Sequence, residues 1–265
     1  MESINTRKST RTYLKQALSE KDSRLIRDYI SKEENRIGLF KNKIGIQLVL
    51  TDMSGKIGTY GIIKNAPAFL IVICENTKEA LIDCGYVFEK MVLFLEENNL
   101  GTCWLGGSFN RKSLKKLGIA PAGEMFVPVI SPVGYKSDNK NFADDIIRQQ
   151  AGSDSRLDFD KMFFSGEYGT RICDSAIREK LELVRLAPSS SNKQPWRIVM
   201  NGQGAADFYI ERFPNYAGNK FGYDMQMLDM GIAATHYAIA FGKEAVSVYE
   251  IDAVNDISAE YVFSI

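Results

Sequence analysis

Two short stretches of this sequence repeat one another, and each leads into a long apolar segment. Leu-Ile-Asp-Cys-Gly-Tyr at residues 81–86 matches Met-Leu-Asp-Met-Gly-Ile at residues 227–232. Residues 77–99 and 223–241 predict long helices, with the aspartate of each Asp-x-Gly near the helix start, where the helix dipole favours an acid. Glycine inside a helix costs about 1 kcal/mol relative to alanine, so two glycines at equivalent places indicate a close helix–helix contact.

A weaker similarity relates residues 25–30 to residues 181–186. Together the two pairs predict two diverged copies of one α+β unit, at residues 1–150 and 151–265. Residues 136–155 are polar and charged, which is typical of a linker between such halves.

Hydrophobic patterns predict the other elements. Helices are expected at residues 21–35, with Ser19 or Asp22 as the cap, and at residues 111–117. Strands are expected at residues 44–51, 68–74, 125–132 and 245–249, and a hairpin joins residues 197–200 to 206–212 across Asn-Gly-Gln-Gly.

A polar loop follows the predicted helix that begins near Leu181. Proline clashes with the preceding helical turn, so Pro188 must end this helix and place residues 189–192, Ser-Ser-Ser-Asn, in a loop before the apolar run of residues 198–200. Such a loop presents hydroxyl, amide and backbone N–H groups to a polar ligand, or it satisfies only its own backbone.

Charge and residue usage exclude several classes of function. The chain carries 33 basic and 33 acidic residues, which gives no support for a nucleic-acid or membrane footprint and favours a small-molecule partner. Its four cysteines lack metal-ligand or Cys-x-x-Cys spacing, and no apolar signal segment or membrane span is evident, so a soluble cytoplasmic protein is predicted. His236 is the only histidine, which argues against a catalytic triad or a histidine-rich metal site.

Three motifs, spread over most of the chain, resemble those of the FMN-dependent nitroreductase family. They are Arg-Lys-Ser-Thr-Arg-Thr-Tyr at residues 7–13, Leu-Gly-Thr-Cys-Trp-Leu-Gly-Gly at residues 100–107 and Ala-Pro-Ser-Ser-Ser-Asn-Lys-Gln-Pro-Trp-Arg at residues 187–197. The resemblance implies a nitroreductase-like α+β fold, with central antiparallel sheets flanked by helices. The family works as a homodimer with flavin at the subunit interface, so the repeat implies a monomer that acts as an internal pseudo-dimer.

The resemblance also implies which residues bind FMN. Arg7, Ser9 and Arg156 would hold the phosphate or ribityl chain, Arg11 the pyrimidine edge, and the backbone of residues 105–107 the N5 side of the ring. The loop from the second half would close over the ring and ribityl chain, while Gln194 and Trp196 are expected to be structural, with the Trp196 indole N–H paired. The full set is Arg7, Lys8, Ser9, Arg11, Leu105, Gly106, Gly107, Arg156, Pro188, Ser189, Ser190 and Asn192.

Each half carries only part of this set, so one composite site is expected per chain and the reciprocal site is expected to be empty. By resemblance, NADH or NADPH would reduce FMN, which would then reduce a nitroaromatic, a quinone or a similar electron-poor small molecule by a ping-pong route, with no catalytic side chain and no metal. Three alternatives stay open: a flavin-fragmenting or dehalogenating reaction, a flavin-binding protein without turnover, and a protein that has kept the motifs without the cofactor.

Overall fold

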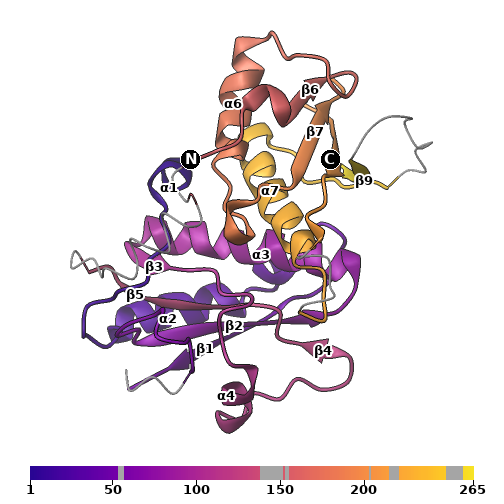
Figure 1. Cartoon of the computed structure of the whole chain (residues 1–265). Coiled ribbons are helices and arrows are strands. Elements are labelled where there is room, and N and C mark those ends of the chain that lie inside the picture. The colour runs from indigo at the N-terminus through magenta and orange to yellow at the C-terminus, as the bar shows by residue number, and fades with distance from the viewer. Residues whose placement is uncertain (53–56, 138–151, 153–154, 203, 215–220, 249–258) are drawn as a thin grey trace.

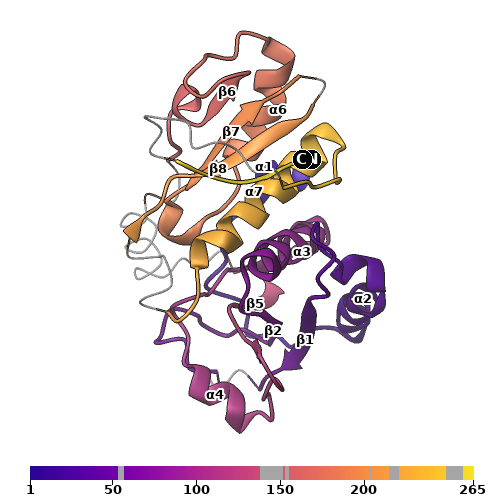
Figure 2. The same cartoon turned by 90° about the vertical axis from the view of Figure 1, so that its right-hand side faces the viewer.

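Two sheets lie on either side of a pair of long helices (Figures 1 and 2). The computed structural model describes residues 1–52, 57–137, 152, 155–202, 204–214, 221–248 and 259–265. The helices between the sheets are α3 (Lys78–Glu97) and α7 (Met225–Phe241). The predicted α+β class, with largely antiparallel sheets flanked by helices, is confirmed.

The first sheet is built from the N-terminal half and is antiparallel throughout. Its strands run in the order β1 (Gly45–Leu50), β2 (Ala68–Glu75), β5 (Ile130–Tyr135) and β3 (Leu100–Thr102), and β4 (Met125–Phe126) also pairs with β2. The continuous apolar run of β2 is buried on both faces, as a central strand requires. Short helices α1 (Glu2–Thr6) and α4 (Arg111–Lys116) flank this half.

Helix α2 (Glu20–Ser31) begins where the sequence predicts, but it is shorter. Ser19, rather than Asp22, is the cap: its side chain accepts the Asp22 N–H at 3.0 Å. The predicted helix at residues 21–35 ends at Ser31, and a separate 3-10 turn, η1 (Glu33–Arg36), follows.

The second sheet comes from the C-terminal half, in the order β6 (Phe163–Ser165), β7 (Trp196–Met200), β8 (Ala206–Ile210) and β9 (Glu260–Ser264). The predicted hairpin is confirmed as the antiparallel pair β7–β8, whereas β6 and β7 run parallel. Helix α6 (Ser175–Arg185) precedes the polar loop, and the 3-10 turns η2 (Phe159–Lys161) and η3 (Ser190–Asn192) complete this half.

Two strand predictions were wrong. The expected single strand at residues 125–132 is divided into β4 and β5, because Pro128 between them has no N–H to donate to a neighbouring strand. The strand expected at residues 245–249 contributes only an isolated bridge between Ser247 and Ser264 among the described residues, and the closing strand is β9, which is buried from Val262 to Ser264. Residue 249 lies outside the described residues.

The predicted close contact between α3 and α7 is confirmed. A methyl group on Gly85 would collide with the Leu228 carbonyl of α7, and one on Gly231 with the Ile82 carbonyl of α3. Close to this contact, the Thr235 hydroxyl donates across the interface to the Tyr86 carbonyl at 2.9 Å. The two helices therefore meet backbone against backbone, which only glycine permits.

The sequence predicted that the aspartates of the two Asp-x-Gly stretches lie at the helix starts, and this was wrong. Thr77 and Asp224 cap α3 and α7, and the repeated aspartates lie in the second turn. Asp83 instead accepts hydrogen bonds from the loop between η1 and β1, and Asp229 from the loop between α6 and β7. These loops occupy equivalent places in the order helix, loop, two strands and long helix, which both halves follow.

One apolar core joins the two halves through α3 and α7. Trp196 is fully buried in it, but its indole nitrogen has no hydrogen-bond partner among the described residues, so the expected pairing was wrong. The indole belongs to the apolar core cluster, where the described residues provide it with no acceptor. The expected linker at residues 136–155 and the boundary between residues 150 and 151 fall mostly outside the described residues.

Candidate functional site

A cleft of about 520 Å³ lies between the two halves, beside α7. The first half contributes the extended arm after α1 and the turn after β3, and the second half contributes the polar loop and one side of α7. All the predicted site residues except Lys8 line this cleft: Arg7, Ser9, Arg11, Leu105, Gly106, Gly107, Arg156, Pro188, Ser189, Ser190 and Asn192.

The arm at residues 7–13 is held in an extended conformation along β3. Ser9 forms a bridge with Thr102, and the Thr10 N–H donates to the Thr102 carbonyl at 2.8 Å. Side chains of an extended chain alternate between two sides. Arg7, Ser9 and Arg11 therefore face the cleft together, and Lys8 faces away and is exposed.

The turn at residues 103–108 forms one wall of the cleft. The Leu105 N–H is used within the fold, since it donates to the Ile130 carbonyl at 2.9 Å. Within the described part of the chain, the N–H groups of Gly106 and Gly107 have no hydrogen-bond partner, so these two remain for a ligand. Arg111 fastens the turn by donating to the Gly106 carbonyl at 3.0 Å.

Side chains of the second half explain why this turn needs glycine. A methyl group on Gly106 would lie 2.8 Å from Cε of Met225, and one on Gly107 would lie 2.6 Å from Cε1 of Phe221. From the sequence, Gly106 and Gly107 were expected to be small so that the backbone can approach a ligand closely. The structure adds a second cause, because Met225 and Phe221 line the cleft and pack against the turn.

The polar loop after α6 forms the opposite wall, and Pro188 follows the end of the helix as predicted. Ser191, Asn192 and Gln194 have φ of 48°, 55° and 50°, a left-handed conformation that costs non-glycine residues about 1 kcal/mol or more each. Hydrogen bonds hold the loop in this shape: the Gln194 N–H donates to Oγ of Ser189 at 2.8 Å.

Arg156 and Asn192 brace this loop. Arg156 donates from Nη2 to the Leu186 carbonyl at 3.2 Å and from Nη1 to Oδ1 of Asn192 at 3.3 Å. Asn192 in turn donates to the Ser155 carbonyl at 2.9 Å. Gln194 is structural, as predicted, because its side chain is buried and accepts the Leu157 N–H at 2.9 Å.

Asp229 is a site residue that the motifs did not identify. Its Oδ1 accepts the Ser190 N–H at 2.9 Å and so anchors the loop to α7, while Oδ2 is buried without a partner among the described residues. Burial is the main cause that raises the pKa of Asp229 well above its ordinary value, and the Ser190 N–H opposes it. Burial therefore favours the protonated form of this carboxyl, which lies behind the loop. The sequence feature that could have identified Asp229 is the repeated Asp-x-Gly, which places an acid within an apolar helix.

The raised pKa of Asp229 makes the protein less stable as pH rises. Below about pH 4 the carboxyl is protonated in both the folded and the unfolded state, and above it only the unfolded chain releases the proton. The free energy of unfolding therefore falls with pH from about pH 4 towards the folded-state pKa. Asp229→Asn keeps an acceptor for Ser190 and removes this titration, so we expect a higher melting temperature than wild type at pH 8 and a smaller difference at pH 5.

Asp83→Asn is the matched comparison, because burial raises the pKa of Asp83 as well, but the hydrogen bonds that this carboxyl accepts from Phe40 and Asn42 oppose the effect. The Asp83 carboxylate accepts the backbone N–H groups of Phe40 and Asn42 at 2.9 and 3.0 Å and the Asn42 side-chain amide at 3.0 Å. An asparagine amide would set its NH₂ against one of these donors, which costs about 1–3 kcal/mol. Equal pH dependence in wild type and Asp229→Asn would contradict the assignment.

Within the described ranges, no group of three or more histidine, cysteine, aspartate or glutamate side chains is placed to hold a metal ion. None of the described helices combines the length and the apolar character needed to cross a bilayer. Cys74, Cys84 and Cys103 are buried, Cys173 is exposed, and none of the four forms a disulfide within the described part of the chain.

Comparison with known proteins identifies the class to which this fold and cleft belong. A family model described as "Putative TM nitroreductase" matches residues 1–241. The structure of a "putative nitroreductase" from Thermotoga maritima superimposes with a TM-score of 0.61 at 20% sequence identity, over 99% of this chain and 91% of that one. The fold is thus that of the nitroreductases, which are oxidoreductases. The chain belongs to this nitroreductase family.

Shorter nitroreductases match about half of the chain. An FMN-dependent nitroreductase from Clostridium difficile is 19% identical over 54% of this chain and 92% of its own, with a TM-score of 0.40. A "putative nitroreductase" from Desulfovibrio desulfuricans, solved in complex with FMN, is 22% identical over 54% of this chain and 92% of its own, also with a TM-score of 0.40. No curated protein matches the sequence.

Proposed function

We propose that the protein is an FMN-dependent oxidoreductase that uses NADH or NADPH to reduce nitroaromatics, quinones or similar electron-poor small molecules. The observation that carries the proposal is the convergence of the three family motifs, distant in sequence, on one cleft. The cleft volume of about 520 Å³ is in the range of cofactor sites.

The donors of the cleft fit the parts of FMN. A phosphate with about two negative charges needs cations and hydroxyl groups, which Arg7, Ser9 and Arg11 supply on one side of the arm. A flat ring needs a wall without side chains and a hydrogen-bond donor beside its reactive edge, which Gly106 and Gly107 supply. Apolar side chains, among them Leu228 and Ile232, also line the cleft.

FMN, when bound, would supply the redox chemistry by accepting a hydride from the nicotinamide and passing reducing equivalents to the acceptor. The residues of the chain would bind the phosphate, orient the ring and hold N–H donors towards it. We propose one such site per chain, formed by residues 1–150 and 151–265 together, in a monomeric cytoplasmic protein.

The test is the visible absorption spectrum of the purified protein, with the released flavin quantified per chain. About one FMN per chain is expected, together with acceptor-dependent oxidation of NADH or NADPH when menadione or nitrofurazone is added. Flavin without any acceptor-dependent rate would indicate a flavin-binding protein without turnover, or a flavin-fragmenting or dehalogenating enzyme. About two FMN per chain would contradict the single composite site, and no flavin after incubation with FMN would contradict the proposed function.

A further inference from the structure

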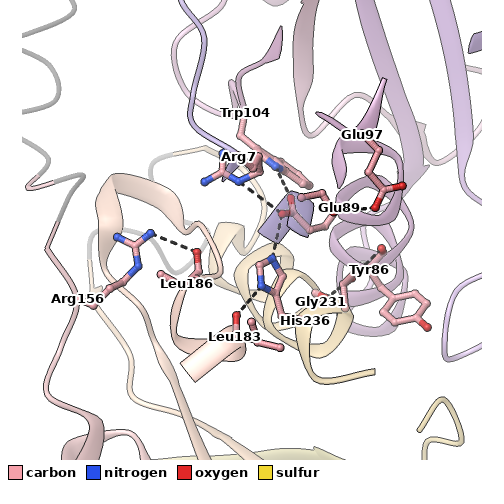
Figure 3. A network of polar contacts seen from close by, with 12 residues as sticks. Arg7, Tyr86, Glu89, Glu97, Trp104, Arg156, Leu183, Leu186, Gly231 and His236 are labelled. Carbon is pink, nitrogen blue, oxygen red and sulfur yellow. Dashed lines mark hydrogen bonds and ion pairs between the residues drawn. The ribbon is translucent and has the colours of Figure 1, made fainter. Parts of the chain in front are cut away.

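Behind the arm that carries Arg7, a fully buried carboxylate connects the two halves. Glu89 on α3 and His236 on α7 are both 0% exposed and meet where the helices pack together (Figure 3). Oε1 of Glu89 lies 3.2 Å from Nε2 of His236 and 3.9 Å from Nε of Arg7. Oε2 accepts the indole N–H of Trp104 at 2.9 Å.

The hydrogen bonds of His236 determine where its protons lie. Nδ1 is 2.8 Å from the Leu183 carbonyl, which can only accept, so Nδ1 carries a hydrogen. Nε2 faces the Glu89 carboxyl, so one further proton lies between these two groups. Trp104 donates to this carboxyl group and the Arg7 cation lies beside it, an arrangement that suits a carboxylate paired with a protonated imidazole.

We propose that His236 is a buried imidazolium, and that the Glu89 carboxylate, held between it and Arg7, is a positioning residue that aims Arg7 at the cleft. The proposal rests on the proposed function, since Arg7 is taken to hold the FMN phosphate. Because Nε of Arg7 faces Glu89, the two terminal nitrogens of the guanidinium are left for the cleft, which the Arg7 side chain lines while only 8% exposed.

The same carboxylate also positions the glycine turn. Trp104 directly precedes Leu105 and Gly106, so the hydrogen bond from its indole to Glu89 ties this wall to α3. His236 extends the connection to α6 through Leu183. One carboxylate therefore sets the position of the arm and the turn relative to the second half, on which the opposite wall is built.

Charge balance around the pair matches an anionic ligand. Arg7 and the imidazolium carry two positive charges against the single negative charge of Glu89. A net positive charge next to a cleft attracts an anionic ligand, and cations that are already held in place lower the entropic cost of binding that ligand. A phosphate group is thus the partner that this network fits.

The protonation state of His236 is testable without flavin, because His236 is the only histidine in the chain. In a long-range ¹H–¹⁵N correlation spectrum of the whole wild-type protein at pH 7, both ring nitrogens are expected at the shifts of protonated nitrogens. One protonated and one unprotonated nitrogen, the pattern of a neutral tautomer, would overturn the assignment. This measurement holds even if a variant fails to fold.

The positioning role is tested with Glu89→Gln, which keeps the size of the side chain and removes its charge. Binding of FMN, measured by fluorescence titration of the apoprotein, is expected to weaken about tenfold or more, as for loss of a charge-assisted contact, and the Trp104 indole N–H resonance is expected to shift. Glu96→Gln is the matched control, because Glu96 is a mostly buried carboxylate on the same helix that pairs with Lys136, away from the cleft.

The outcomes separate this inference from the proposed function. If wild type binds FMN and Glu89→Gln binds it equally well, the positioning role is wrong and the proposed function stands. If wild type does not bind FMN, the proposed function fails, and the ¹⁵N shifts of His236 still decide whether the imidazolium exists.

Discussion

Purified Arg7→Ala/Arg11→Ala protein is expected to be colourless, and its affinity for added FMN is expected to fall about 100-fold or more. Each arginine lines the cleft from the same side of the extended arm. A hydrogen bond to a charged group contributes about 1.5–3 kcal/mol, and tenfold in affinity corresponds to about 1.4 kcal/mol, so the loss of two such contacts accounts for this change. Fluorescence titration of the apoprotein with FMN measures it directly.

Lys8→Ala is the control for that experiment. It removes a cation from the same arm, but Lys8 is exposed and lies outside the cleft, so flavin content is expected to match wild type. Loss of flavin from Lys8→Ala, or full flavin content in the double variant, would contradict the prediction that the alternation of side chains along the arm determines which cations bind FMN.

The largest effect on stability is expected from Gly231→Ala. The added methyl group would collide with the Ile82 carbonyl and lie 2.7 Å from the Tyr86 backbone nitrogen, neither of which can move without displacing α3. Overpacking of this kind costs about 3 kcal/mol, which corresponds to a fall in melting temperature of roughly 6–12 °C for a chain of this size.

Ile239→Ala on the same helix serves as the control, because Ile239 is 39% exposed and its truncation is expected to shift the melting temperature by no more than about 2 °C. Thermal unfolding followed by circular dichroism distinguishes the two variants. If Gly231→Ala has the same melting temperature as wild type, the helices do not meet backbone against backbone at this position.

The parts of the fold that could be predicted from sequence are those that local chemistry decides. Pro188 ends a helix wherever the chain goes next, and Gly85 and Gly231 mark a helix contact because glycine is unfavourable in a helix without one. The apolar run of β2 must be buried whatever its neighbours are.

Features that depend on distant partners could not be predicted. The closing strand is β9 rather than residues 245–249, because β8 pairs along its edge with residues 260–264, which are distant in sequence, and a register shift occurs between Phe208 and Tyr209. The acids of the two Asp-x-Gly stretches hold loops rather than helix ends, which depends on which loop folds over each helix.

The same limit applies to the cleft. The motifs indicated the polar residues, because these are common to the family that the sequence resembles. They did not indicate Glu89, a single acid within an apolar helix, whose partners Trp104 and His236 are distant in sequence. Met225 and Phe221 were missed for the same reason, since their contact with the glycine turn exists only after the halves pack together.

The crossing of α3 and α7 also limits how the molecule can move. Because α3 and α7 interlock backbone against backbone at Gly85 and Gly231, we expect the two halves to move as one unit there. Successive ligands would therefore enter and leave a cleft of constant width, and any gating would fall to side chains and loops at its rim rather than to closure of one half upon the other.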